Sequence, residues 1–192
     1  MIVIGASLGG SRALRTLFRN LPGSLPVPLA VVLHRHKETE EQLAPFLQTG
    51  SALVVSEALD KEPIQPGRIY IAPPDYHLLV EPTCFNLSTD EPVQHARPSI
   101  DVLFESAADA FGPRVIGVVL TGTGSDGAHG AAQIKRRGGQ VVVQDPETAE
   151  SPAMPSAVLK ATQTPFIRPL NQIAETLNQL AQAMLRACRE NE

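Results

Sequence analysis

Short apolar runs alternate with amphipathic segments along most of the chain. Each run is as short as a buried strand, and the segments between the runs have apolar residues at the spacing of a helix that packs on a sheet. The runs predict strands at 1–4, 29–33, 52–55, 115–120 and 140–143. The amphipathic segments predict helices at 11–18, 38–47, 99–110, 127–137 and 170–189. This alternation is typical of βαβ units, so we expect a Rossmann-like, doubly wound α/β fold with a mostly parallel sheet and helices on both faces.

The segment 68–88 has a different pattern. It contains short apolar runs at 69–72, 78–80 and 84–88, separated by two turns that contain proline. Turns this short usually join antiparallel strands, so we expect these runs to form an antiparallel ribbon at the edge of the sheet. No repeat, low-complexity tract or linker divides the sequence, and residues 1–192 are expected to form a single domain.

Composition and charge narrow the class of protein. Apolar residues make up 43% of the chain and charged residues 19%, as in an ordinary globular domain. The net charge of −4 and the lack of a basic stripe argue against a nucleic-acid partner. No apolar stretch has the length of a membrane span and no signal peptide opens the chain, so we expect a cytoplasmic protein without membrane insertion. Cys84 and Cys188 lack metal-ligand spacing, so neither a zinc site nor a disulfide is expected.

Candidate chemistry begins at the end of the first predicted strand. Residues 5–9 have the pattern G-x-S-x-G, with Ser7 between Gly5 and Gly9, and a predicted helix follows directly. A strand–turn–helix of this kind can expose a nucleophilic serine. A similar glycine-rich turn also opens nucleotide-binding domains, or only packs a helix closely on a strand. The motif alone leaves these three interpretations open.

Two further candidate residues follow predicted strands, where open α/β sheets bind their ligands. His34 comes directly after strand 29–33, and Asp126 lies in the glycine-rich loop 121–127 after the central strand. A serine becomes a good nucleophile when an imidazole removes its proton and a carboxylate holds that imidazole. The backbone N–H groups of the loop can also face a developing oxyanion. Serine, histidine and aspartate are therefore expected to face one crevice.

Each of these positions has an alternative when the residues are considered alone. His36 could replace His34, although His34 directly abuts the apolar run. Asp126 fits a cap of the helix predicted from Gly127 as well as a triad member, and Asp145 is a competing acid. The remaining histidines are assigned no role: His77, His95 and His129.

Five segments carry a more specific pattern. They are 4–10, the strand that ends at His34, 66–73, 97–104 and 120–127. Together they closely resemble the catalytic domain of the bacterial chemotaxis methylesterases, the CheB family, from the first residues to about residue 161. The simplest interpretation of segment 97–101, whose role the residues do not reveal, is that it begins a helix beside the site.

The resemblance assigns roles to the candidate residues. It implies that Ser7 is the nucleophile, His34 the base and Asp126 its partner, in preference to His36 and Asp145. It also implies an oxyanion hole formed by the backbone N–H groups of Thr123 and Leu8. Leu8 stands where the family usually has a small polar residue, and 35–37 replaces the usual Met-Pro after the base.

The resemblance also implies an activity. The family hydrolyses γ-glutamyl methyl esters on methylated chemoreceptors or related signalling proteins and releases methanol, and a companion activity deamidates glutamine through the same acyl-enzyme. No metal or organic cofactor is expected. The family carries an N-terminal receiver domain, whereas this chain begins at the first catalytic strand, so we expect a free-standing catalytic unit. A receiver-domain protein acting in trans is a candidate regulator.

Two other functions are alternatives to a serine hydrolase. A nucleotide-binding module is disfavoured because the sequence has no G-x-G-x-x-G, and because the second strand ends in His34 where such a module needs an acidic residue. A non-catalytic signalling adaptor with the same fold is favoured only by the altered segment 35–37.

Overall fold

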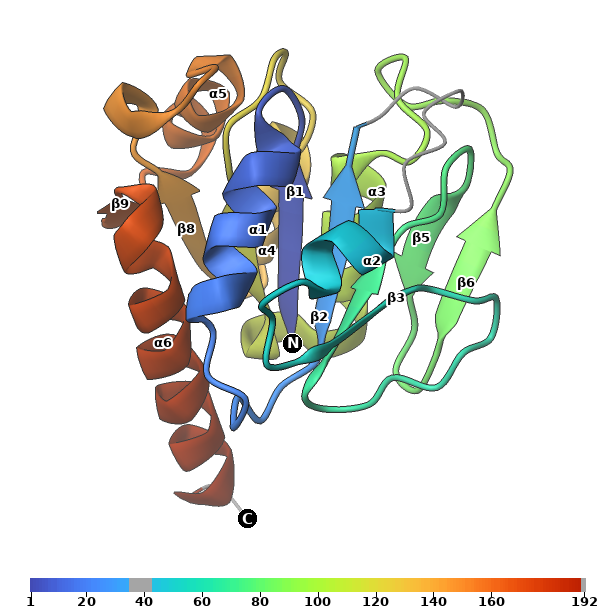
Figure 1. Ribbon diagram of the computed structural model, residues 1–192, viewed down its shortest axis with the longest axis vertical. Coiled ribbons are helices and arrows are strands. Elements are labelled where there is room, and N and C mark those ends of the chain that lie inside the picture. Colours follow the sequence, from blue (N-terminus) through green and yellow to red (C-terminus); the bar gives the residue numbers. More distant parts are fainter. Residues whose placement is uncertain (35–42, 191–192) are drawn as a thin grey trace.

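The computed structural model describes residues 1–34 and 43–190 (Figure 1). Within these ranges a seven-stranded parallel sheet has the order β3-β4-β2-β1-β7-β8-β9. Its strands are β1 (Ile2–Ala6), β2 (Leu29–Leu33), β3 (Val54–Glu57), β4 (Arg68–Ile71), β7 (Ile116–Val119), β8 (Gln140–Gln144) and β9 (Phe166–Arg168). A separate antiparallel pair consists of β5 (His77–Val80) and β6 (Phe85–Ser88).

Helices cover both faces of the parallel sheet (Figure 1). One face is covered by α1 (Gly10–Asn20), α2 (Leu43–Gln48) and α6 (Leu170–Glu190). The other is covered by α3 (Ile100–Phe111), α4 (Ala128–Arg136) and α5 (Ala153–Thr162). The hairpin β5–β6 packs against α3 on this second side. No helix among the described residues is long and apolar enough to cross a membrane.

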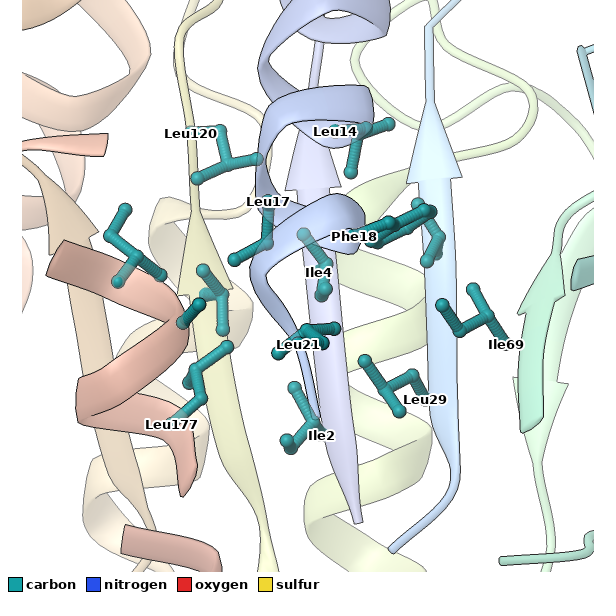
Figure 2. Close-up of a cluster of buried hydrophobic side chains, with 14 of the residues drawn as sticks. Ile2, Ile4, Leu14, Leu17, Phe18, Leu21, Leu29, Ile69, Leu120 and Leu177 are labelled. Atoms are coloured by element: carbon teal, nitrogen blue, oxygen red, sulfur yellow. The ribbon is translucent and has the colours of Figure 1, made fainter. Parts of the chain in front are cut away.

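The central strand β1 is buried on both sides. Ile2 and Ile4 belong to the apolar cluster under α1 and α6, whereas Val3 belongs to the cluster under α3 and α4. Figure 2 shows Ile4 beside Phe18 of α1 and Ile2 below Leu21, with Leu177 of α6 at the side of the same cluster. A strand with two buried faces has no polar positions to alternate with its apolar ones. This double burial explains why the strands appear in the sequence as uninterrupted apolar runs.

The fold class expected from the sequence is confirmed, but one detail of the predicted ribbon is wrong. Residues 69–72 were expected in that ribbon, whereas β4 lies between β2 and β3 and pairs with both in parallel. Only β5 and β6 form the antiparallel pair. Ile69, Tyr70 and Ile71 are fully buried, as an interior strand of the sheet requires. The segment after β4 therefore takes the chain out of the sheet instead of turning it back as a hairpin.

Two short elements were not predicted, and one prediction falls partly outside the described residues. The first turn of α5 contains Pro155 and follows Pro152, which hides its helical pattern although a first turn tolerates proline. The edge strand β9 has only three residues. The helix expected at 38–47 is observed from Leu43, and residues 38–42 lie outside the described ranges.

Phe18→Ala is expected to destabilise the protein by about 3–5 kcal/mol, because it removes a fully buried ring between α1 and the sheet. Phe46→Ala is the matched control, since the Phe46 ring is 37% exposed. Its cost is expected to be about 1 kcal/mol or less. Urea denaturation of both variants measures the difference, and equal losses would contradict the assignment of Phe18 to the core.

Candidate active site

Ser7 lies in the turn between β1 and α1, at the carboxyl edge of the sheet. Its backbone N–H donates to Thr121 O at 3.0 Å, and its carbonyl oxygen accepts from Gly10 N at 2.8 Å. Gly9 has a φ of 78°, in the left-handed region that favours glycine. A Cβ at Gly10 would lie 2.5 Å from Cδ1 of Leu33, so only glycine lets α1 begin this close to the sheet. The turn is therefore sharp, and it is held on one side by the loop that follows β7.

The register of the sheet places His34 beside Ser7. Ala6 of β1 pairs with Leu33 of β2, and Ser7 and His34 are the residues that follow this pair. Both residues line the same cleft. Among the described residues no hydrogen bond joins the Ser7 hydroxyl to His34, a contact that in many enzymes forms only when substrate binds.

His34 and Asp126 form a hydrogen-bonded pair although 92 positions separate them in sequence. Nε2 of His34 lies 2.8 Å from Oδ2 of Asp126. His34 is partly exposed, with 21% of its side chain accessible, whereas only 4% of the Asp126 side chain is accessible. The carboxylate thus holds one ring nitrogen from the protein side, and Nδ1 is the ring nitrogen that this pair leaves for proton transfer.

The carboxylate of Asp126 is held at the start of α3. Oδ2 accepts from Ile100 N at 2.7 Å, and Oδ1 accepts from Asp101 N at 2.9 Å and from Ser99 Oγ at 3.0 Å. Burial on its own would raise the pKa of Asp126. The hydrogen bonds from His34, Ile100 N and Asp101 N outweigh it and lower that pKa below its ordinary value. Asp126 is therefore ionised at neutral pH and can stabilise a protonated imidazole.

The alternative in which Asp126 caps the helix that follows it is wrong, although Asp126 does bind the start of another helix. Asp126 does not cap α4, the helix that follows it, because the N-cap of α4 is Gly127 and has no side-chain hydrogen bond. It instead binds N–H groups at the start of α3, about 26 positions earlier in the chain. The competing acid Asp145 caps a short 3-10 turn by accepting from Glu147 N, whereas His34 pairs with Asp126. The alternative base His36 lies outside the described residues.

The N–H groups expected to bind an oxyanion belong to two segments that meet at Ser7. Thr121 joins these segments, because its hydroxyl donates to Leu8 O at 2.9 Å and accepts from Ser151 N at 2.9 Å. Leu8 and Thr123 both line the cleft. Among the described residues neither of their backbone N–H groups donates a hydrogen bond. The Leu8 side chain is 54% exposed at the rim.

The cleft has a volume of about 670 Å³. Its lining consists of Ser7, Leu8, Gly9, His34, Asp75, Pro92, His95, Ala96, Arg97, Pro98 and Thr123. Arg97 fixes the part of the cleft lining that comes from residues 92–98, here called the wall at 92–98. Its guanidinium group donates to Asp75 Oδ1 at 2.9 and 2.6 Å and to the carbonyl oxygens of Thr89 and Asp90 at 2.8 and 3.0 Å. This wall is one function of segment 97–101 that the sequence did not reveal.

Two histidines that were assigned no role lie at or behind the site. His95 lines the cleft. His77 is buried, its Nδ1 accepts from Ser99 N at 3.2 Å, and its Nε2 lies 3.2 Å from Glu91 O. A polar residue at the first position of a buried apolar run was the available signal for His77. His129 is exposed and pairs with Glu105.

The fold and the cleft define a class: a doubly wound α/β protein with serine, histidine and aspartate at the carboxyl edge of its parallel sheet. A family model described as CheB methylesterase matches residues 2–177. The solved catalytic domain of Thermotoga maritima CheB methylesterase matches with a TM-score of 0.90 and 37% identity, over 93% of this chain and 97% of that one. The chain belongs to the CheB methylesterase family.

Full-length relatives give the same family. A Leptospira interrogans protein is 42% identical over 182 residues, and the match covers 94% of each chain. The Thermotoga maritima protein-glutamate methylesterase/protein-glutamine glutaminase is 36% identical, and the match covers 94% of this chain and 54% of the relative. The protein-glutamate methylesterase FrzG of Myxococcus xanthus is 38% identical over 93% of this chain and 54% of its own. The chain thus spans nearly all of the first relative and about half of the other two.

Asp126→Asn is expected to lower the free energy of unfolding by about 1–3 kcal/mol at about pH 7, because an amide replaces an anion that accepts several hydrogen bonds. A carboxyl group whose pKa is lower in the native state than in the unfolded state stabilises the native state at pH values above its unfolded-state pKa. This contribution is lost as the pH falls through the native pKa. The difference between wild type and variant should therefore narrow below about pH 4.

Urea denaturation between about pH 7 and pH 3 measures this difference. The control is Asp90→Asn, which changes an exposed carboxylate away from the helix starts and is expected to leave stability unchanged. A stability loss in Asp126→Asn that is the same at both ends of the pH range would contradict an ionised Asp126.

Proposed function

We propose that this chain is a protein-glutamate methylesterase that hydrolyses γ-glutamyl methyl esters, with Ser7, His34 and Asp126 as its catalytic residues. The observation that carries the proposal is the 2.8 Å contact between Nε2 of His34 and Oδ2 of the buried Asp126, because His34 lines the same cleft as Ser7. Deamidation of glutamine is the second reaction of the same site, in agreement with the double name of the Thermotoga maritima relative. Residues 1–192 act as one catalytic domain.

The first half of the reaction forms an acyl-enzyme. Ser7 Oγ attacks the ester carbonyl carbon while Nδ1 of His34 takes the hydroxyl proton. Backbone N–H groups of Leu8 and Thr123 bind the resulting oxyanion. The tetrahedral intermediate then breaks its bond to the methoxy group, which takes the proton from His34 and leaves as methanol. For a glutamine side chain, ammonia leaves at this step instead.

The second half releases the product. His34 takes a proton from a water molecule, which attacks the acyl carbon of the glutamyl ester on Ser7. The oxyanion returns to the same N–H groups, and the second collapse releases a glutamate side chain and returns the proton to Ser7 Oγ. Throughout, Asp126 keeps the proton of His34 on Nε2, so that Nδ1 is free to accept. No group outside this set is needed to balance the reaction.

The substrate is a methylated glutamate on the cytoplasmic part of a chemoreceptor or of a related signalling protein. A cleft of about 670 Å³ that is lined by the exposed Leu8 and by the wall at 92–98 can accept a single side chain that projects from a larger protein. A receiver-domain protein acting in trans is the proposed regulator. The family membership of the chain supports the proposed substrate.

Ser7→Ala is expected to reduce methanol release from methylated receptor by at least about a thousandfold, because the variant lacks the hydroxyl group that attacks the ester. A fluorophosphonate probe should label wild type and leave Ser7→Ala unlabelled. Ser11→Ala, on the first turn of α1, is the matched control and should keep both labelling and activity. Wild type that neither reacts with the probe nor releases methanol would instead indicate a non-catalytic adaptor.

A further inference from the structure

A second buried carboxylate lies next to Asp126 and has no place in the mechanism above. Asp101, in the first turn of α3, is only 3% exposed. Its Oδ1 accepts from Gly127 N at 2.9 Å and from Gly130 N at 2.7 Å, both at the start of α4. Because the N-cap residue of α4 is a glycine, Asp101 supplies the side-chain cap that α4 lacks.

Asp101 and Asp126 hold each other through backbone groups. Asp126 directly precedes Gly127, and its Oδ1 accepts from Asp101 N at 2.9 Å. Asp126 therefore binds N–H groups at the start of α3, the helix that contains Asp101. Asp101 in turn binds N–H groups at the start of α4, the helix that follows Asp126. Buried carboxylates are stable only when hydrogen bonds replace their lost hydration. Neither residue can shift without breaking contacts of the other, so the position of Asp126 depends on Asp101.

Asp101 also contacts the wall of the cleft. Its Oδ2 accepts from Gln94 Nε2 at 2.8 Å, and Gln94 Oε1 accepts from Ser125 Oγ at 3.1 Å. Gln94 and His95 have φ values of 49° and 65°, in the left-handed region that residues other than glycine rarely adopt. Side-chain hydrogen bonds of Gln94 hold this unfavourable backbone in place. His95, which lines the cleft, is thereby tied to the residue that fixes Asp126.

We propose that Asp101 is a positioning residue for the hydrolysis: it fixes Asp126 at the start of α3 and ties the cleft wall at 92–98 to it through Gln94. This inference rests on the proposed function. Asp101 touches neither substrate nor reacting atoms. It acts by keeping Asp126 in line with His34, and it also keeps the wall at 92–98 in a fixed position relative to Ser7.

The charge of Asp101 changes within the working pH range of a neutral hydrolase. The pKa of Asp101 is raised to about 6, chiefly by burial and also by the carboxylates of Asp126 and Glu105, while the N–H groups of Gly130 and Gly127 oppose the rise. Glu105 is itself paired with His129, and Asp126 with His34. The anion is therefore the main form of Asp101 above about pH 6 and the neutral acid is the main form below it.

Asp101→Asn tests the link to Asp126, because the amide resembles the protonated acid. We expect kcat for methanol release to fall about tenfold to a hundredfold at about pH 8, since Asp126 loses its alignment. The ratio of wild-type to variant kcat should narrow as the pH falls through about 6, where Asp101 of the wild type also becomes neutral. The matched control is Asp109→Asn on the exposed side of the same helix, which should not change kcat.

Labelling by the fluorophosphonate probe separates failure of this inference from failure of the proposed function. Wild type that is not labelled and not active overturns the proposed function. If the wild type is labelled and active, and the Asp101→Asn variant has the same kcat as the wild type, the positioning role of Asp101 is overturned and the proposed function stands. A kcat ratio that does not change with pH also overturns it, because a loss of packing is insensitive to the charge of Asp101.

Gln94→Ala tests the link to the wall without disturbing the core, because Gln94 is exposed. We expect KM to rise about threefold to tenfold with little change in kcat, since the wall loses its anchor while Asp126 keeps its contacts. The control is Gln163→Ala, which changes another exposed glutamine in the left-handed region, at the end of α5. This test can be carried out even if the Asp101→Asn variant fails to fold. An unchanged KM in Gln94→Ala would overturn the link between Asp101 and the wall at 92–98.

Discussion

Two helix starts face two buried carboxylates, and the site is arranged around this contact. A carboxylate taken out of water needs donors, and here backbone N–H groups of α3 and α4 supply most of them. Among the described residues no lysine or arginine contacts either Asp101 or Asp126. Because the N–H groups at a helix start point along the helix axis, they favour the charged form of each carboxylate and fix its direction. His34 then receives a partner whose orientation is already determined.

The strand order explains why these parts meet. β1 lies between β2 and β7, and the connection after β1 covers one face of the sheet while the connection after β7 covers the other. Ligands of doubly wound sheets bind at such a change of direction. Ser7 and His34 are neighbours through the register of β1 and β2, and loop 121–127 reaches Ser7 from the opposite side through β7. The cleft is thus a consequence of the topology, and its walls come from more distant segments.

The sequence predicted what depends on local pattern. Double burial makes strands visible as apolar runs, and the rule that ligands bind at the carboxyl edge pointed to Ser7, His34 and Asp126. Contacts between distant segments were not predictable in this way. An aspartate just before a helix commonly caps that helix, yet Asp126 binds the start of α3. Proline-containing turns gave no sign that β4 joins the parallel sheet. The burial of His77 likewise depends on Ser99 and Glu91, which no local pattern connects to it.

Because backbone N–H groups donate most of the hydrogen bonds to Asp101 and Asp126, the site responds to dissolved salt differently from a surface ion pair. Ion pairs at a protein surface weaken as dissolved salt screens them, within about 8–10 Å at moderate ionic strength. The N–H groups that hold the two carboxylates are covalently part of α3 and α4 and are shielded from the solvent, so mobile ions cannot compete for them. Side-chain modifications that neutralise lysine leave them intact as well. The electrostatic setting of the site is therefore kept as long as the two helices are folded, and it depends only weakly on the salt concentration of the medium.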